Sequence, residues 1–334
     1  MKRDVWHELL DYETYDLVAR AYAMRHGRKA NKRLILSITS NFNQAREFFL
    51  SAEKAALSVR PLLLYYGVLC LSRALVLMLT RGGSEAAMKP SHGLATQKWK
   101  ETIADQNMKN IGDLKVEMCS GTLNELILAI ENKSYLKHAT SGVNYCQGYS
   151  VPRIGETIKF SNLLATFPNL AREYEAWAGG GIPTYVITKL DVKPESCCVY
   201  VKKGKASKEC LVNAFVTEEV LENRDSYMLT MKHENIFLTQ LFDGSFGNIG
   251  DVCIAKPISA NCKLALLPSF YCVSYYLGML VRYFPSVWMS LSSVKTGDAI
   301  FPLLSQLLCL IHDQYPVLIL EFLNSPYEFE NGKN

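Results

Sequence analysis

Cationic side chains gather near the beginning of the chain, in a stretch that lacks acidic ones. Between Leu17 and Arg46 there is no aspartate or glutamate, whereas seven residues are arginine or lysine. Such a stretch can bind the phosphates of a nucleic acid or the carboxylates of an acidic partner. The alternative is a solvated helix end whose charges are offset by acids elsewhere in the fold. The predicted binding residues are Arg20, Arg25, Arg28, Lys29, Lys32 and Arg33.

A second group of polar residues is predicted to be buried and structural. Arg60 and Arg73 belong to an apolar helical run, where an arginine without a partner is costly. Each could clamp a ligand carboxylate or phosphate, but we favour separate ion pairs with Glu47, Glu53 or an acid of the β-rich region. Tyr65 and Tyr66 are expected to be core or interface aromatics with bonded hydroxyls. His92, next to a glycine, is expected to bond a nearby backbone group rather than to face a cleft.

Metal and phosphate sites have no support in the residue spacing. The ten cysteines include no Cys-x-x-Cys pair, and no two histidines stand at a ligand spacing. Glycines at 179–181 and 244–250 lead into predicted strands rather than into a helix N-terminus, so they predict turns and not phosphate loops. We therefore expect neither a metal nor a cofactor.

Size and composition predict a folded protein of the cell interior. Of 334 residues, 49% are apolar and 20% are charged, which is typical of a globular chain. The net charge of +4 is small, so any basic surface is expected to be local. The cysteine pattern and the lack of an apolar signal segment favour reduced thiols and a cytoplasmic location. The apolar runs 61–79 and 264–291 contain arginines or prolines, so we expect buried helices and no membrane contact.

The candidate residues named above must be positioned by helices, which are predicted both before and after the central part of the chain. Apolar residues from Ile35 to Val59 recur at alternating spacings of three and four, which predicts one long amphipathic helix. Pro61 then opens an apolar helix to Leu79. Because no loop residues separate the two, we expect a sharp corner rather than a tight antiparallel hairpin. Further helices are predicted at 123–130, 169–178, 270–288 and 300–312, with a last short helix opened by Pro316.

The centre of the chain has a different pattern. Short β-branched or alternating runs predict strands at 184–190, 197–202, 211–216, 227–231, 252–258 and 263–267. Residues 84–120 are polar and mixed, with a loop at 89–93. The predicted fold class is α+β, with a helical body formed by N- and C-terminal helices and an inserted antiparallel β-rich region. The three predicted regions are 1–178, 179–268 and 269–334.

Several of these signatures, taken in order, resemble the bacterial YaaC-like family. The N-terminal ones are Trp6, Tyr12, the segment Ala45–Ala52, the segment Arg60–Gly67 and His92-Gly93-Leu94; the C-terminal ones are Arg282–Pro285, Trp288 and Tyr315-Pro316. Together they bracket almost the whole chain, but they are structural residue types. The resemblance therefore implies no catalytic residue, and it puts no constraint on residues 100–260.

More loosely, the long amphipathic helix and the Leu-Tyr-Tyr helix after it are similar to HEPN-type proteins of prokaryotic conflict systems. That resemblance implies a ribonuclease in which an arginine precedes a histidine by four to six residues. The imidazole would transfer a proton and the guanidinium would stabilise the phosphate. Arg20 and His26 have this spacing and are candidate catalytic residues. Against them, Gly27 predicts a helix end, and the pair precedes the long helix, whereas a HEPN site lies late in its bundle.

The leading prediction is a non-catalytic interaction or accessory protein of the YaaC-like type, in a bacterial anti-phage defence assembly. Its basic surface would bind a partner protein, a second copy of the chain or a nucleic acid. Whether the protein is an enzyme stays open, with a HEPN-like ribonuclease as the first alternative. The second alternative is a nucleotide or small-molecule sensor with a pocket between the helical body and the inserted sheet.

Overall fold

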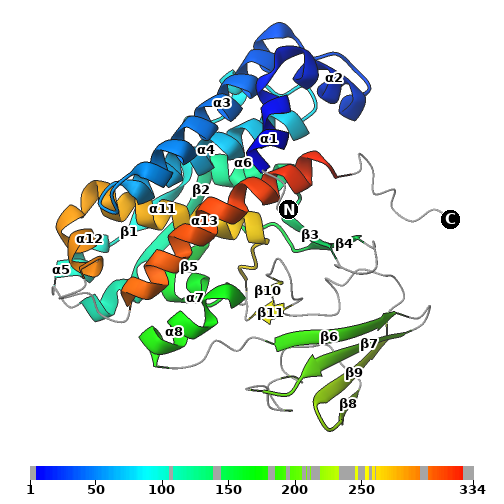
Figure 1. Cartoon of the computed structure of the whole chain (residues 1–334), viewed down its shortest axis with the longest axis vertical. Helices are drawn as coiled ribbons and strands as arrows, with labels where there is room; N and C mark the ends of the chain where they lie inside the picture. The colour runs from blue at the N-terminus through cyan, green and yellow to red at the C-terminus, as the bar shows by residue number, and fades with distance from the viewer. Residues whose placement is uncertain are drawn as a thin grey trace.

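The computed structural model describes residues 5–104, 108–137, 144–179, 185–192, 196–204, 208, 211, 219–232, 245–246, 253–255, 258–259, 261–293 and 300–325. Within this part of the chain, N- and C-terminal helices pack into one body (Figure 1). The strands form sheets of three, six and two strands, and all their pairings are antiparallel. The predicted α+β class is confirmed.

The first helices are short and lead into a long one. They are α1 (Val5–Leu9), a 3-10 turn η1 (Leu10–Glu13) and α2 (Tyr15–His26). Gly27 ends α2 in the left-handed conformation, with a φ of 63°, as the sequence predicted. Asn31 then caps α3 (Lys32–Lys54), because its side-chain oxygen accepts a hydrogen bond of 2.8 Å from the Leu34 amide.

The predicted corner between the two long helices is wrong. α3 ends at Lys54, and the five residues 55–59 turn the chain before α4 (Arg60–Leu79). The turn lets α4 run back along α3, because Phe49 lies against Gly67 while Gln44 contacts Cys70. Gly67 permits this close approach, since a Cβ atom there would lie 2.6 Å from the Phe49 ring. The two helices therefore form an antiparallel pair.

α4 is the central helix, covered on its other sides by later parts of the chain. These are α6 (Thr122–Ala129), α11 (Leu266–Tyr283) and α13 (Ile300–Leu323). A Cβ atom at Gly278 of α11 would lie 2.8 Å from Cβ of Tyr65. The sequence predicted that Pro316 opens a new helix. This is wrong, because Pro316 lies inside α13. The buried hydroxyls of Tyr315 and Ser72, 2.7 Å apart, hold this part of α13 on α4 despite the missing backbone donor.

A three-stranded sheet lies against α11 and α6, and two of its strands fall almost entirely within residues 84–120, where the sequence predicted polar, mixed chain. Its order is β1-β2-β5, formed by β1 (His92–Gln97), β2 (Lys115–Gly121) and β5 (Thr157–Lys159). Val116 and Met118 of β2 are buried while Lys115 is exposed, so β2 has one apolar face. The shorter elements around it are η2 (Glu85–Ala87), α5 (Trp99–Ala104), η3 (Met108–Asp113), α7 (Phe160–Leu164), η4 (Pro168–Leu170), α8 (Ala171–Ala178) and α12 (Pro285–Leu291).

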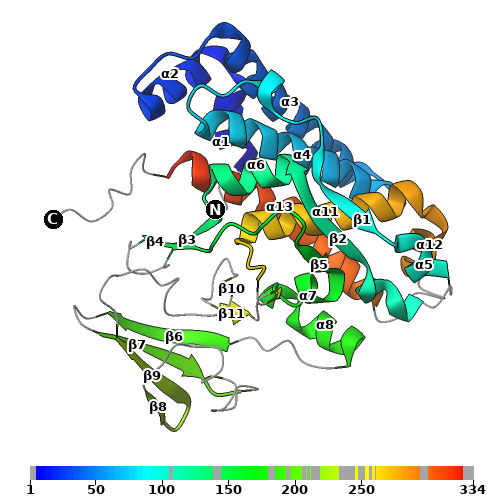
Figure 2. The ribbon, with the colours of Figure 1, turned by 180° about the vertical axis from the view of Figure 1, so that it is seen from behind.

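The predicted antiparallel region after 184 is confirmed in much of its described part, but the predicted strand 263–267 is wrong, because these residues lead into a helix that begins at Leu266. The six-stranded sheet has the order β10-β11-β6-β7-β9-β8. Both views place its larger strands at the end of the molecule away from α2 (Figures 1 and 2). The predicted strand 211–216 lies almost entirely outside the described residues. The strands are β6 (Tyr185–Val192), β7 (Ser196–Lys202), β8 (Glu219–Glu222), β9 (Ser226–Lys232), β10 (Ser245–Phe246) and β11 (Cys253–Ala255), with β3 (Lys133–Lys137) and β4 (Asn144–Gly148) in a separate hairpin.

In the part of the chain that the structure describes, two helices, α4 and α13, are long and apolar enough to cross a membrane by length and composition alone. In the molecule, 67% and 56% of their apolar windows are buried, which is typical of helices that form a core. The absence of membrane contact stays a prediction.

Candidate functional site

A groove of about 640 Å³ runs between α3 and α4 on the outer face of the helix pair. Its walls come from the two helices, and Glu85 of η2 closes one end. The antiparallel pairing makes this groove, because side chains at helical spacing on the two facing surfaces meet across it. The lining residues are Arg33, Leu36, Ser37, Ser40, Asn41, Gln44 and Phe48 from α3, and Tyr66, Leu69, Cys70 and Arg73 from α4.

One end of the groove is aromatic. The rings of Phe48 and Tyr66 stack with centroids 5.6 Å apart. Arg282 of α11 donates a hydrogen bond of 3.2 Å to the Tyr66 hydroxyl, and its guanidinium lies 5.1 Å from the centre of the Tyr283 ring. These contacts hold the Tyr66 ring in place from outside the groove.

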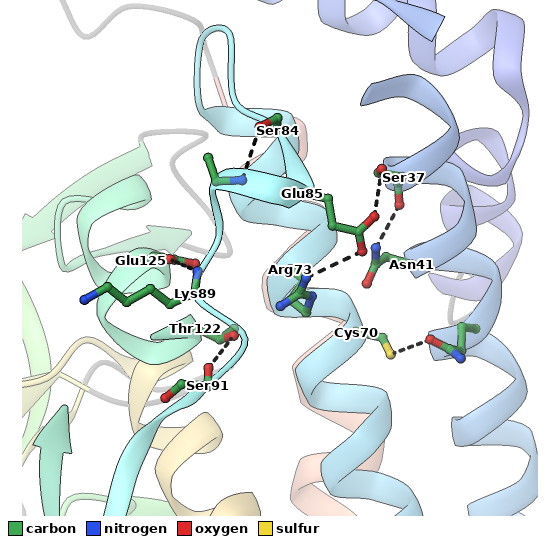
Figure 3. A network of polar contacts seen from close by, with 12 residues as sticks. Ser37, Asn41, Cys70, Arg73, Ser84, Glu85, Lys89, Ser91, Thr122 and Glu125 are labelled. Carbon is green, nitrogen blue, oxygen red and sulfur yellow. Dashed lines mark hydrogen bonds and ion pairs between the residues drawn. The ribbon is translucent and has the colours of Figure 1, made fainter. Parts of the chain in front are cut away.

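The other end of the groove is charged. Arg73 forms an ion pair with Glu85 at 3.5 Å, and Ser37 donates a hydrogen bond of 2.9 Å to the second oxygen of that carboxylate. Figure 3 shows Glu85 between Ser37 and Arg73 in the gap between the helices. Arg33 is exposed at the same end, and it forms no ion pair with any residue that the structure describes.

Neutral hydrogen-bonding groups lie between the two ends. The Cys70 thiol donates to the side-chain oxygen of Gln44 at 3.3 Å, which orients that amide. Burial raises the pKa of Cys70 to about 11, so the thiol stays protonated and unreactive at neutral pH. Asn41 donates to the Ser37 carbonyl oxygen at 2.8 Å. The centre of the groove therefore offers polar contacts without a nucleophile.

The structure does not bring Arg20 and His26 together. Six residues of α-helix rotate by about 600°, so the two side chains leave different faces of α2. Arg20 is exposed, while His26 donates from Nε2 to the Met78 carbonyl oxygen at 2.9 Å and packs on the Tyr22 ring. The histidine thus joins α2 to the end of α4.

The predicted basic residues divide into two groups. Arg25 is half-buried and donates to the carbonyl oxygens of Phe322 and Leu323, at 3.1 and 2.9 Å, so it joins α2 to the end of α13. The other group lies exposed where α2 leads into α3, and we call it the basic corner: Arg28, Lys29, Lys32 and Arg33. Arg20 stands apart from it on α2.

The residues predicted to be buried and polar have different partners from those expected. Arg60 pairs with no acid among the described residues; its guanidinium donates to the carbonyl oxygens of Ala52 and Glu53, 3.0 Å away in each case. These bonds supply donors to carbonyl groups in the last turn of α3, where no helical amide is left to pair with them. Arg73 does form an ion pair, but with Glu85, which lies just beyond α4.

His92 begins β1 rather than lying in a loop. Its Nδ1 is 2.6 Å from the hydroxyl of Tyr65, which is fully buried, and Tyr271 donates to its backbone oxygen. Burial, with a smaller effect of Arg282, lowers the pKa of His92, while burial raises the pKa of Tyr65. Both side chains are therefore neutral at pH 7, in a structural contact between α4 and β1.

Sequence reasoning missed the groove and two residues that shape it. Glu85 is exposed in a polar segment, and only the fold back of α4 brings it opposite Ser37. Gln44 lies on the polar side of the α3 pattern and carried no signal of its own. Among the described residues, no three histidine, cysteine, aspartate or glutamate side chains are close enough to hold a metal ion.

Comparisons with known proteins give one match. A family model described as YaaC-like Protein matches residues 12–323, nearly the whole chain. No curated protein and no solved structure matches the chain.

Proposed function

The chain belongs to the YaaC-like protein family, and we propose that it is a non-catalytic interaction protein whose basic corner binds an acidic partner protein. One observation carries the proposal. Arg28, Lys29, Lys32 and Arg33 are exposed together at the start of α3, and none forms an ion pair within the described residues.

Their position makes this arrangement unfavourable for the protein alone. The N-terminus of a helix carries a partial positive charge, so cations there destabilise the helix, by roughly 0.3–1 kcal/mol for each charge near the end. The first turn of α3 contains Lys32 and Arg33 and no acidic residue. An acidic partner would relieve this repulsion, and it would be attracted from a distance by the summed field.

Other features of the helical body support binding rather than catalysis. His26 and Arg25, the neighbours of the basic corner that could do chemistry, are engaged in contacts with α4 and α13. We place the role in a larger assembly, with anti-phage defence as the proposed setting. The following experiment distinguishes binding of an acidic partner protein from binding of a nucleic acid.

The experiment compares two variants with the same change in net charge. Tagged protein is purified from its native host as wild type, as Lys29→Glu/Lys32→Glu, and as the control Lys100→Glu/Lys115→Glu, whose lysines are exposed on α5 and β2. A partner protein should be retained by wild type and control, and lost from the corner variant or at high salt. Retention by all three proteins contradicts the proposal, and so does a nuclease-sensitive partner.

Catalysis is tested separately with purified protein and single-stranded RNA. We expect no cleavage. Cleavage that disappears in both Arg20→Ala and His26→Ala would replace the proposed function by a ribonuclease.

A further inference from the structure

The groove between α3 and α4 has the size of a small-molecule site. Its volume of about 640 Å³ falls within the usual range for such sites, roughly 300–1,000 Å³. Leu36, Ser40 and Gln44 are exposed along one wall, so the groove is open to solvent. Its two ends differ in chemistry, which restricts what can occupy it.

A planar ring would fit the aromatic end. Tyr66 and Phe48 are both half-buried and stacked on each other, and Leu69 lies one turn from Tyr66 on α4. Nucleobases stack on such rings in a way that tolerates different bases. Because Arg282 bonds the Tyr66 hydroxyl, the ring is already held in position before a ligand arrives.

An anion would fit the other end. Arg73 follows Tyr66 by seven residues, so both side chains lie on one face of α4 about 10 Å apart along its axis. Arg33 also lines the groove, from the first turn of α3, and it adjoins the basic corner. Arginine side chains suit phosphate because the guanidinium presents paired donors.

Glu85 occupies part of this end as an internal anion. It is the one carboxylate among the described residues that line the groove, and it accepts hydrogen bonds from both Ser37 and Arg73. Its bond to Arg73 is long, at 3.5 Å, and nearly half of its side chain is exposed. A ligand phosphate could therefore take over Arg73 while Glu85 turns to solvent.

We propose that this groove binds a nucleoside monophosphate, with the base against the ring pair of Tyr66 and Phe48 and the phosphate at the end that contains Arg33 and Arg73. The amide of Gln44, held through its oxygen by Cys70, keeps its nitrogen available to donate to the base or the ribose. This site adjoins the surface proposed for the acidic partner, and the two share Arg33.

The proposal is tested by calorimetric titration with AMP, GMP, CMP and UMP, with adenosine and inorganic phosphate as partial ligands. At least one nucleotide should bind, and each partial ligand should bind at least about ten-fold more weakly. Tyr66→Ala should weaken binding roughly ten-fold, whereas Tyr66→Phe, which keeps the ring, should not. Arg33→Ala should also weaken binding roughly ten-fold. Arg20→Ala, an exposed arginine on α2, serves as the matched control and should leave the affinity unchanged.

Glu85→Gln provides a result that a purely structural role would not produce. Removal of the internal anion should tighten nucleotide binding several-fold, since Arg73 no longer has a competing carboxylate. The melting temperature of each variant shows whether it is folded.

Three results would overturn the site. They are no heat from any nucleotide at millimolar concentration, equal affinity for inorganic phosphate and for nucleotides, and binding that survives Tyr66→Ala. The proposed partner surface is judged independently, since Lys29→Ala/Lys32→Ala removes the corner lysines and should change nucleotide affinity by less than about three-fold.

Discussion

The hydroxyl of Tyr65 and Nδ1 of His92 are 2.6 Å apart, and this contact joins the central helix to the first strand of the three-stranded sheet. Tyr65 is fully buried, so its hydroxyl has no water to replace the imidazole. Tyr65→Phe should therefore destabilise the protein by about 1–2 kcal/mol, because His92 loses its partner while the ring packing is kept. Urea unfolding measures the difference. Tyr66→Phe, at a half-exposed hydroxyl, is the matched control and should cost less.

The same pair predicts how stability depends on pH. Burial lowers the pKa of His92 in the folded state below its ordinary value of 6.5, so the unfolded chain takes up a proton at higher pH than the folded one. The contribution of neutral His92 to the free energy of unfolding is therefore full above about pH 6.5. It decreases as the pH falls from there through the pKa of His92 in the folded protein.

The predicted loss of stability below about pH 6.5 is tested by measuring the free energy of unfolding at about pH 7.5, 6.5 and 5.5 for wild type and for His92→Gln. The variant should show a flatter profile over this range. Parallel profiles would contradict the proposed burial of a neutral imidazole.

Any side chain at Gly278 is predicted to destabilise the protein. A Cβ atom there would lie 2.8 Å from Cβ of Tyr65, which cannot move because it is attached directly to α4. Gly278→Ala should destabilise the protein by about 1–3 kcal/mol through overpacking. Gly204→Ala is the matched control, since nothing lies within 4 Å of a Cβ atom at that position. Thermal unfolding of both variants measures the difference.

Arg25 and Arg28 are predicted to have opposite roles although they lie three residues apart. Arg25→Ala removes the bonds to the last carbonyl groups of α13 and should cost about 1–3 kcal/mol of stability. Arg28→Ala removes an exposed cation and should change stability by less than about 0.5 kcal/mol, while it weakens binding of an acidic partner. Chemical unfolding and partner binding, measured on both variants, separate the two roles.

The sequence predicted the parts of the fold that have a strong local pattern. The apolar stripe from Ile35 and the apolar run after Pro61 identified the two long helices, and β-branched runs identified β6, β7 and β9. The strands β1 and β2 were missed. Their apolar faces are short, and only the contact with α11 and α6 makes them strands.

The groove was beyond sequence reasoning for a related reason. Its walls depend on the direction in which α4 leaves α3, and the five residues of the turn reverse that direction. Ser37, Arg73 and Glu85 come from three separate elements and meet only after this reversal. The basic corner could be anticipated because its four residues lie within a short segment, 28–33, but the structural role of Arg25 could not.

The contacts of α2 with α13 also determine when the body can be completed during synthesis. Arg25 bonds residues that follow it by 297 and 298 positions. α4 is predominantly apolar, and α11 and α13, which cover much of it, are made last. A nascent chain therefore carries a partly uncovered apolar helix through most of its translation, and this long-range closure favours slow folding and dependence on chaperones.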